Sequence, residues 1–142
     1  MANYNAVART NYFRVVDEAS YNRLAERLVS ETGVEDFSFA DNGVVYHGFG
    51  SYSSVEFLQG PDKDGEEWSD TIWEFAGELQ KILPDGEAFI YQETGHENLR
   101  YVTGFSVIAT KEDIQSVDLS NASVNLARTM LGKPDWKTKM EY

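Results

Sequence analysis

The largest set of side chains that could do chemistry lies between residues 62 and 83. All of its members are carboxylates: Asp62, Asp64, Glu66, Glu67, Asp70, Glu74 and Glu78. The first four belong to an acidic turn. The last three recur every four residues, which places them on one face of a helix. Such a row can bind a cation, act in acid–base catalysis, or attract a positively charged partner.

The acidic turn matches a calcium-binding loop only in part. An EF-hand loop has three alternating oxygen ligands before its glycine and a glutamate at its twelfth position. In the run Asp62-x-Asp64-Gly65-x-Glu67 the glycine comes too early, and that glutamate is not in place. We therefore expect a solvated acidic loop and no metal site. With 24 acidic residues in the chain, some carboxylate pair will lie at a glycosidase distance by chance, so such a pair predicts no activity.

No other catalytic pattern is present in the sequence. The two histidines, His47 and His96, are far apart and belong to no HExxH-like motif. The chain contains no G-x-S-x-G, Walker A or G-x-G-x-x-G sequence, and it has no cysteine. A thiol nucleophile and a cysteine-type zinc site are thus excluded. We expect no enzyme activity, no catalytic residue and no cofactor.

The carboxylates require an element that positions them, and the pattern predicts a helix over Trp68–Leu83. Its apolar face, at about 100° per residue, comprises Trp68, Ile72, Ala76, Leu79 and Leu83, with Phe75 and Ile82 at the edge. Glu67 or Ser69 could cap its start, and the run 84–86 (Pro-Asp-Gly) ends it. The apolar face needs a core, whereas the acidic face needs only water or a cationic partner.

The first half of the chain predicts a central strand, a helix and a hairpin. Residues 6–16 are expected to form the strand, with Val7, Arg9 and Phe13 on one face and Tyr12 on the other. Asp17 can cap a helix at 18–31, and Gly33 can end it. Asn42-Gly43 predicts a hairpin between strands at 34–40 and 44–49. Residues 54–58 could be another strand.

After the acidic helix, the pattern predicts strands at 87–94, 99–110 and 114–119, with a turn at 95–98 between the first two. Ser120 is expected to cap a last helix at 121–131, and residues 133–142 form a peripheral tail. That helix is expected to bury Val124, Ala127, Met130 and Leu131. The fold class is therefore α+β, with an antiparallel sheet of about five to six strands and three helices mainly on one face. We expect a single globular domain over 1–142.

The formal net charge of −12 is unevenly distributed. Residues 1–30 carry +1, residues 31–97 carry −14 and residues 98–142 carry +1. This excess disfavours direct binding to nucleic acid or anionic lipid, because both require lysine and arginine. The first residues contain no signal-peptide pattern and no apolar run is long enough to span a membrane, so we expect a cytoplasmic protein.

The expected strands carry many aromatic residues, and some of them have arginine close by in the sequence. One group of such residues could stack and bind a nucleotide-type ligand: Arg9, Tyr12, Arg14, Arg100 and Tyr101. Exposed aromatic side chains on an open sheet could equally form a homodimer interface.

Two stretches resemble small acidic proteins of phages and mobile elements, most of them of unknown function. They are residues 8–15 (ARTNYFRV) and 97–105 (ENLRYVTGF). The resemblance implies a setting in which antirestriction and anti-CRISPR proteins occur, some of which imitate DNA. It assigns no functional residue.

Charge and setting together favour a non-enzymatic inhibitor that mimics nucleic acid. Its seven carboxylates between Asp62 and Glu78 would occupy the basic DNA- or RNA-binding groove of a defence nuclease or CRISPR effector. Fourteen charges would match roughly 24 Å of duplex, at one charge per about 1.7 Å. The alternatives are a nucleotide-type small-molecule binder that uses arginines and sheet aromatics, and a dimeric accessory domain with a solubilising acidic face.

Overall fold

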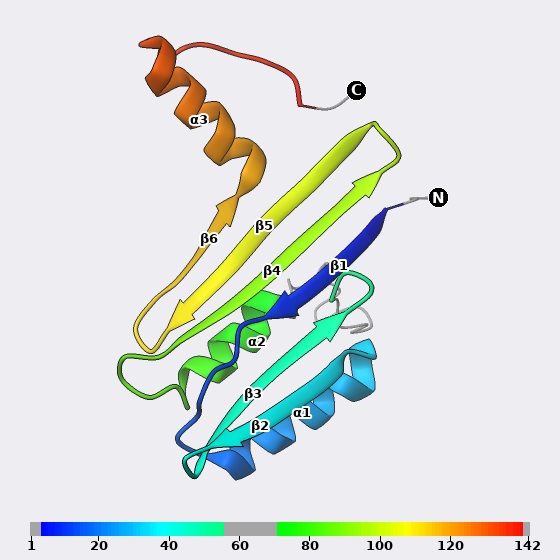
Figure 1. The fold of residues 1–142 in the computed structure, drawn as a ribbon, viewed down its shortest axis with the longest axis vertical. Helices are drawn as coiled ribbons and strands as arrows, with labels where there is room; N and C mark the ends of the chain where they lie inside the picture. The colour runs from blue at the N-terminus through cyan, green and yellow to red at the C-terminus, as the bar shows by residue number, and fades with distance from the viewer. Residues whose placement is uncertain (1–3, 56–70, 141–142) are drawn as a thin grey trace, which may run out of the picture.

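The computed structural model describes residues 4–55 and 71–140, and it contains one six-stranded antiparallel sheet and three helices (Figure 1). The strands are β1 (Asn5–Thr10), β2 (Glu35–Asp41), β3 (Val44–Ser51), β4 (Ala88–Glu97), β5 (Tyr101–Thr110) and β6 (Ile114–Asp118). The helices are α1 (Glu18–Thr32), α2 (Thr71–Gln80) and α3 (Leu119–Leu131). The order across the sheet is β2-β3-β1-β4-β5-β6. The expected α+β class is confirmed.

Helices α1 and α2 pack on the same side of the sheet, which we call the covered face. Tyr21 of α1 contacts the ring of Phe13, with 5.6 Å between centroids. Phe75 of α2 contacts the ring of Phe49 at 5.3 Å. Both contacts are edge-on, the arrangement that aromatic quadrupoles prefer. The expected apolar face of the acidic helix is confirmed where it is described, because Ile72, Ala76 and Leu79 are buried there. The expected start of this helix, residues 68–70, lies outside the described residues.

Local sequence signals explain the ends of α1 and the β2–β3 hairpin. The Asp17 carboxylate accepts hydrogen bonds from the hydroxyl and the backbone N–H of Ser20, and these bonds lower the pKa of Asp17. Gly33 ends α1 with a φ of 72°, which only glycine adopts without strain. Asn42 and Gly43 both have positive φ, as the expected two-residue turn requires.

The prediction of an unbroken strand over 6–16 is wrong, because the ladder is interrupted at Asn11. The Asn11 side chain bonds the Ala88 carbonyl and the Ile90 N–H of β4 in place of backbone groups. On the other side, the N–H of Phe49 donates to the Thr10 hydroxyl. The alternation of buried and exposed side chains therefore shifts by one residue. Thr10 and Phe13 both face the core, and the expected pairing of Phe13 with Arg9 on one face is lost.

The expected turn at 95–98 is also wrong in position. Strand β4 continues to Glu97, since Gly95 pairs with Ala6 and His96 pairs with Asn5. The chain reverses only at Asn98, which has a φ of 48°. Of the possible strand at 54–58, Ser54 and Val55 are not in a strand and the rest lies outside the described residues.

Helix α3 departs most from expectation. Asp118 caps it in place of Ser120, accepting a hydrogen bond from the N–H of Asn121, so the helix begins at Leu119. None of its residues is buried, which contradicts the expected burial of Val124, Ala127, Met130 and Leu131. Figure 1 shows why: α3 extends from the end of β6 away from the sheet and from the two core helices.

Candidate ligand-binding surface

The side of the sheet opposite α1 and α2, which we call the bare face, carries a cluster of aromatic rings on β2, β3 and the segment after β1. We call this cluster, with one arginine, the aromatic platform: Arg9, Tyr12, Phe37, Phe39 and Tyr46. Tyr12 contacts Phe37 and Phe39 edge-on at 5.4 and 4.7 Å, and Phe39 stacks on Tyr46 at 5.0 Å. Both Tyr12 and Phe39 remain exposed. The platform therefore offers aromatic surface to a ligand.

Arg9 lies against this platform. Its guanidinium carbon is 5.8 Å from the ring centroid of Tyr12 and 5.5 Å from that of Phe37. Its Nε donates a 3.0 Å hydrogen bond to the Thr10 carbonyl, which fixes the plane of the group. Within residues 4–55 and 71–140, no carboxylate lies within ion-pair distance of Arg9. Its charge is available to a ligand.

Two glycines of β3 make room for the platform. A side chain at Gly48 would place its Cβ 2.6 Å from Cε2 of Phe37, closer than real contacts allow. At Gly50 the nearest atom would be the Ala8 carbonyl oxygen at 3.3 Å. Phe37 thus lies flat on the strand above Gly48. The shift at Asn11 is equally necessary, because it moves Tyr12 to the side of the sheet on which Arg9 lies.

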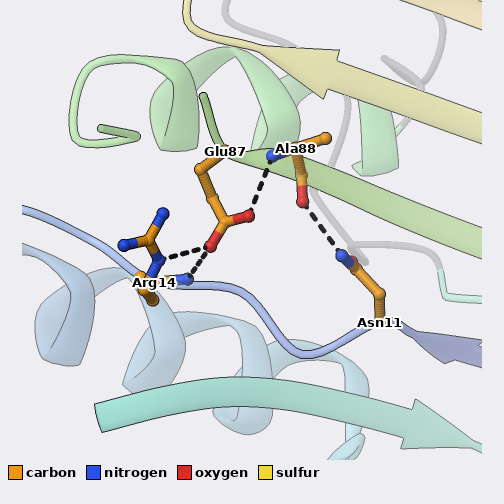
Figure 2. Close-up of polar contacts among 4 residues, drawn as sticks. All are labelled: Asn11, Arg14, Glu87 and Ala88. Carbon is orange, nitrogen blue, oxygen red and sulfur yellow. Dashed lines mark hydrogen bonds and ion pairs between the residues drawn. The ribbon is translucent and has the colours of Figure 1, made fainter. Parts of the chain in front are cut away.

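Of the five residues expected to bind a small ligand, the structure brings only Arg9 and Tyr12 together. Arg14 is held by Glu87, as Figure 2 shows: its backbone N–H and its Nε both lie 2.9 Å from Oε2 of that carboxylate. This pairing raises the pKa of Arg14. Nearby, the Asn11 amide bonds the carbonyl of Ala88 (Figure 2). These contacts tie the segment after β1 to the start of β4, and they occupy Arg14.

The other two residues of that group lie at the opposite end of the sheet. Arg100 is in the turn before β5, 3.8 Å from the Glu97 carboxylate. Tyr101 stacks on Tyr4 with 6.2 Å between centroids. Phe37, Phe39 and Tyr46 belong to the strand aromatics that the sequence offers for stacking, but the expected five-residue group did not include them. Their alternation with small or polar residues on two hairpin strands was the signal that could have grouped them.

The expected acidic row is only partly described, since Asp62, Asp64, Glu66, Glu67 and Asp70 lie outside the described residues. Glu74 lies 3.6 Å from Arg27 of α1, and Glu78 lies 3.0 Å from Lys81. Further carboxylates of the central segment have cations from the two ends of the chain beside them: Asp85 with Lys111, Glu87 with Arg14, and Glu97 with Arg100. Cations are therefore interleaved with this part of the acidic surface.

A buried carboxylate, Glu93, was not foreseen. Only 5 % of it is exposed, and it accepts hydrogen bonds from the hydroxyls of Tyr4, Ser54 and Tyr91 at 2.9, 2.8 and 2.6 Å. Burial, and then this bond to Glu93, raise the pKa of Tyr91. The alternation of Phe89, Tyr91 and Glu93 already places Glu93 on the covered face. Three donors satisfy the buried charge, so we assign the cluster a structural role.

The two histidines lie in different surroundings. His47 is buried against the Tyr21 ring and lies 2.8 Å from Glu18, which joins β3 to α1. His96 is exposed on β4. No set of three or more His, Asp or Glu residues in the described ranges is arranged to hold a metal ion. A hollow of about 350 Å³ between the start of β4 and the end of β5 is lined by Asp85–Ala88 and Thr110–Glu112, and its Lys111 is already paired with Asp85.

No helix in the described parts of the chain is both long and apolar enough to cross a membrane. Comparisons with protein-family models, with curated proteins and with solved structures found no match to this chain.

Proposed function

We propose that this chain is a non-enzymatic binding protein that holds a planar, nucleotide-type ligand on the aromatic platform. The observation that carries the proposal is Arg9, a cation held over the rings of Tyr12 and Phe37 with no carboxylate partner among the described residues. An aromatic base stacks on the exposed faces of such rings, at about 1–3 kcal/mol per base. The remaining N–H donors of Arg9 then bind the ligand's acceptor atoms.

The charges around the platform narrow the class of ligand. Glu35 and Asp41 alternate with Phe37 and Phe39 along β2, so they lie on the same face as the rings. They would repel a polyphosphate or a nucleic-acid strand, while Arg9 alone can neutralise one negative charge. The ligand that fits best is a base or nucleoside carrying at most one phosphate.

The test is calorimetric titration with a base, its nucleoside, its monophosphate and its triphosphate. We expect the monophosphate or nucleoside to bind most tightly. Arg9→Gln and Phe39→Ala should each weaken binding about tenfold or more, the loss that corresponds to about 1.4 kcal/mol. Arg23→Gln is the matched control, because Arg23 lies on α1 and bonds only Ser20 in the described structure. Equal binding by Arg9→Gln and Arg23→Gln would refute the site.

A second variant tests the construction of the platform without removing any of its members. Gly48→Ala places a methyl group within 2.6 Å of Phe37 and 3.2 Å of the Asn11 carbonyl. Phe37 must move, so we expect weaker ligand binding. Gly77→Ala on α2 is the control, since nothing lies within 4 Å of the added Cβ there. The comparison should be made at matched folded fractions, checked by circular dichroism.

A second candidate function, inhibition of a nucleic-acid-binding protein by an acidic surface, is favoured by one observation. Edge strand β2 exposes Glu35, Asp36 and Asp41, and none of them has a cation within ion-pair distance in the described structure. These charges add to the expected row that ends at Glu78. A basic groove would bind them by releasing counterions, with affinity that falls as salt rises.

Two triple variants test that second candidate in a pull-down eluted with a salt gradient. The first replaces Asp70, Glu74 and Glu78 by the amides, and the second replaces Glu35, Asp36 and Asp41 in the same way. A decoy should elute at lower salt after either change. If both variants release every captured protein at the same salt concentration as the wild type, this second candidate is wrong.

A further inference from the structure

Two opposite charges border the aromatic platform on the same row of the sheet. Strand register pairs Gly50 of β3 with Arg9 of β1 on one side and with Glu35 of β2 on the other. Paired residues of neighbouring strands point to the same face, so the Arg9 and Glu35 side chains both lie on the bare face. Neighbouring strands are about 4.8 Å apart, which puts the backbones of β1 and β2 about 10 Å apart. A guanidinium and a carboxylate therefore lie on either side of β3.

Strand β3 places no side chain between these two charges, because the residue between them is Gly50. A Cβ added there would lie 3.8 Å from Cε1 of Phe37, so the Phe37 ring borders the same space. No ion pair joins Arg9 to Glu35, and Glu35 has no hydrogen-bond or ion-pair partner in the part of the chain that the structure describes. The carboxylate and the terminal N–H groups of Arg9 are therefore available to a ligand that lies between them.

This pair of charges selects a base by the hydrogen-bonding groups on its edges. A guanidinium donates two parallel N–H bonds to two adjacent acceptors, as it does to O6 and N7 of guanine. A carboxylate accepts two bonds from two adjacent donors. Guanine carries both sets, because its N1–H and its 2-amino group are adjacent donors next to O6. Adenine, cytosine and uracil have no two adjacent donor groups, so an acceptor atom of theirs would face the carboxylate.

We propose that the aromatic platform prefers a guanine-type base, with Arg9 on O6 and N7 and Glu35 on N1–H and the 2-amino group. This inference rests on the proposed function, and it names the base that the same site takes. The base then covers Gly50 and contacts the ring of Phe37. Bonds from N–H donors to a carboxylate are charge-assisted and roughly twice as strong as bonds between neutral groups. Glu35 therefore determines which base is held.

The first experiment compares guanosine, inosine and adenosine by calorimetric titration of the wild-type chain. Inosine differs from guanosine only in lacking the 2-amino group, so it loses one hydrogen bond to Glu35. We expect guanosine to bind about tenfold more tightly than inosine. Adenosine should bind most weakly, because its N1 acceptor would face the carboxylate. Equal affinity for the three nucleosides would leave the platform as a base-binding site and would overturn only this inference.

The second experiment assigns the preference to Glu35. Glu35→Gln should reduce the ratio of guanosine to inosine affinity from about tenfold to less than about threefold, since a neutral amide is a weaker acceptor and carries donors of its own. Asp36→Asn is the matched control, because it removes the same charge from the next residue. Asp36 pairs with buried Phe49 and lies on the covered face, so the ratio should not change. Both acidic side chains are exposed, and neither variant should alter the circular dichroism spectrum.

A third variant separates the two sides of Arg9. Gln92 of β4 pairs with Arg9 on the side away from Gly50, and its side chain is exposed on the same face. Gln92→Ala should leave the ratio of guanosine to inosine affinity unchanged. If Gln92→Ala changes this ratio and Glu35→Gln does not, the base lies over β4 and the role given to Glu35 is wrong. If none of the three nucleosides binds the wild type, the proposed function fails together with this inference.

Discussion

Helices α2 and α3 are both amphipathic, but only α2 has its apolar side chains buried. Ile72, Ala76 and Leu79 of α2 lie in the core beneath the sheet, whereas no residue of α3 is buried. Both helices satisfy the same periodic rule in the sequence. The difference teaches that periodicity predicts an apolar face, while the connections of the chain decide what covers it. Helix α2 lies beside α1 on the covered face of the sheet, and α3 follows the edge strand β6.

The largest expected difference is between two leucines. Leu79→Ala removes a fully buried side chain, so we expect a loss of about 2–5 kcal/mol in the free energy of unfolding. Leu126→Ala, measured at a concentration where the chain is monomeric, should change it by less than about 0.5 kcal/mol. Urea denaturation gives both values. Similar losses for the two variants would show that α3 is packed within a single chain.

Two tyrosine variants extend the comparison of buried and exposed positions to the covered and bare faces of the sheet. Tyr91→Phe removes the 2.6 Å hydrogen bond to buried Glu93. Because the acceptor is a charged group, we expect a loss of about 1.5–3 kcal/mol. Tyr46→Phe changes a ring on the bare face and should cost less than about 0.5 kcal/mol. If Tyr91→Phe is as well tolerated as Tyr46→Phe, the Glu93 cluster does not stabilise the fold.

The smallest expected effect concerns alkaline pH. Burial raises the pKa of Tyr21 in the folded state, while the unfolded chain ionises at about pH 10. Below about pH 10 the tyrosine is protonated in both states, so its contribution to the free energy of unfolding is fully present. Above that pH the unfolded state loses the proton first, so the free energy of unfolding declines as pH rises. Tyr21→Phe should unfold like the wild type at neutral pH and lose less stability above pH 10. If the free energy of unfolding depends on pH in the same way for both proteins, this prediction is wrong. Tyr52→Phe is the control, because it removes an exposed phenol.

Local signals predicted most of the fold. Asp17, Gly33 and Asn42-Gly43 act within a few residues of themselves, so the sequence alone indicated where α1 and the hairpin begin and end. The break at Asn11 could not be predicted, because it depends on β4, which lies nearly 80 residues further along the chain. The exposure of α3 was missed for a related reason: its apolar pattern does not indicate whether another element packs against the helix.

The candidate site was predicted in part. Arg9 and Tyr12 were identified from their residue types, but the expected grouping with Arg14 failed because Glu87 binds that arginine. The partners that the structure provides, Phe37 and Phe39, come from a different hairpin. Strand register, which no local pattern specifies, brings them together.

The extra residue at Asn11 has a consequence for how the chain can change in length. Before this point even-numbered residues enter the core, and after it Phe13 does, so the two halves of the segment are out of phase. Deleting Asn11 would leave Phe13 two residues after Thr10, a spacing at which a regular strand keeps both in the core. Deleting Arg9 would instead leave Ala8 next to Thr10 and expose one of the two to water. Changes in length should therefore be tolerated in the loops of this protein and rejected within β1.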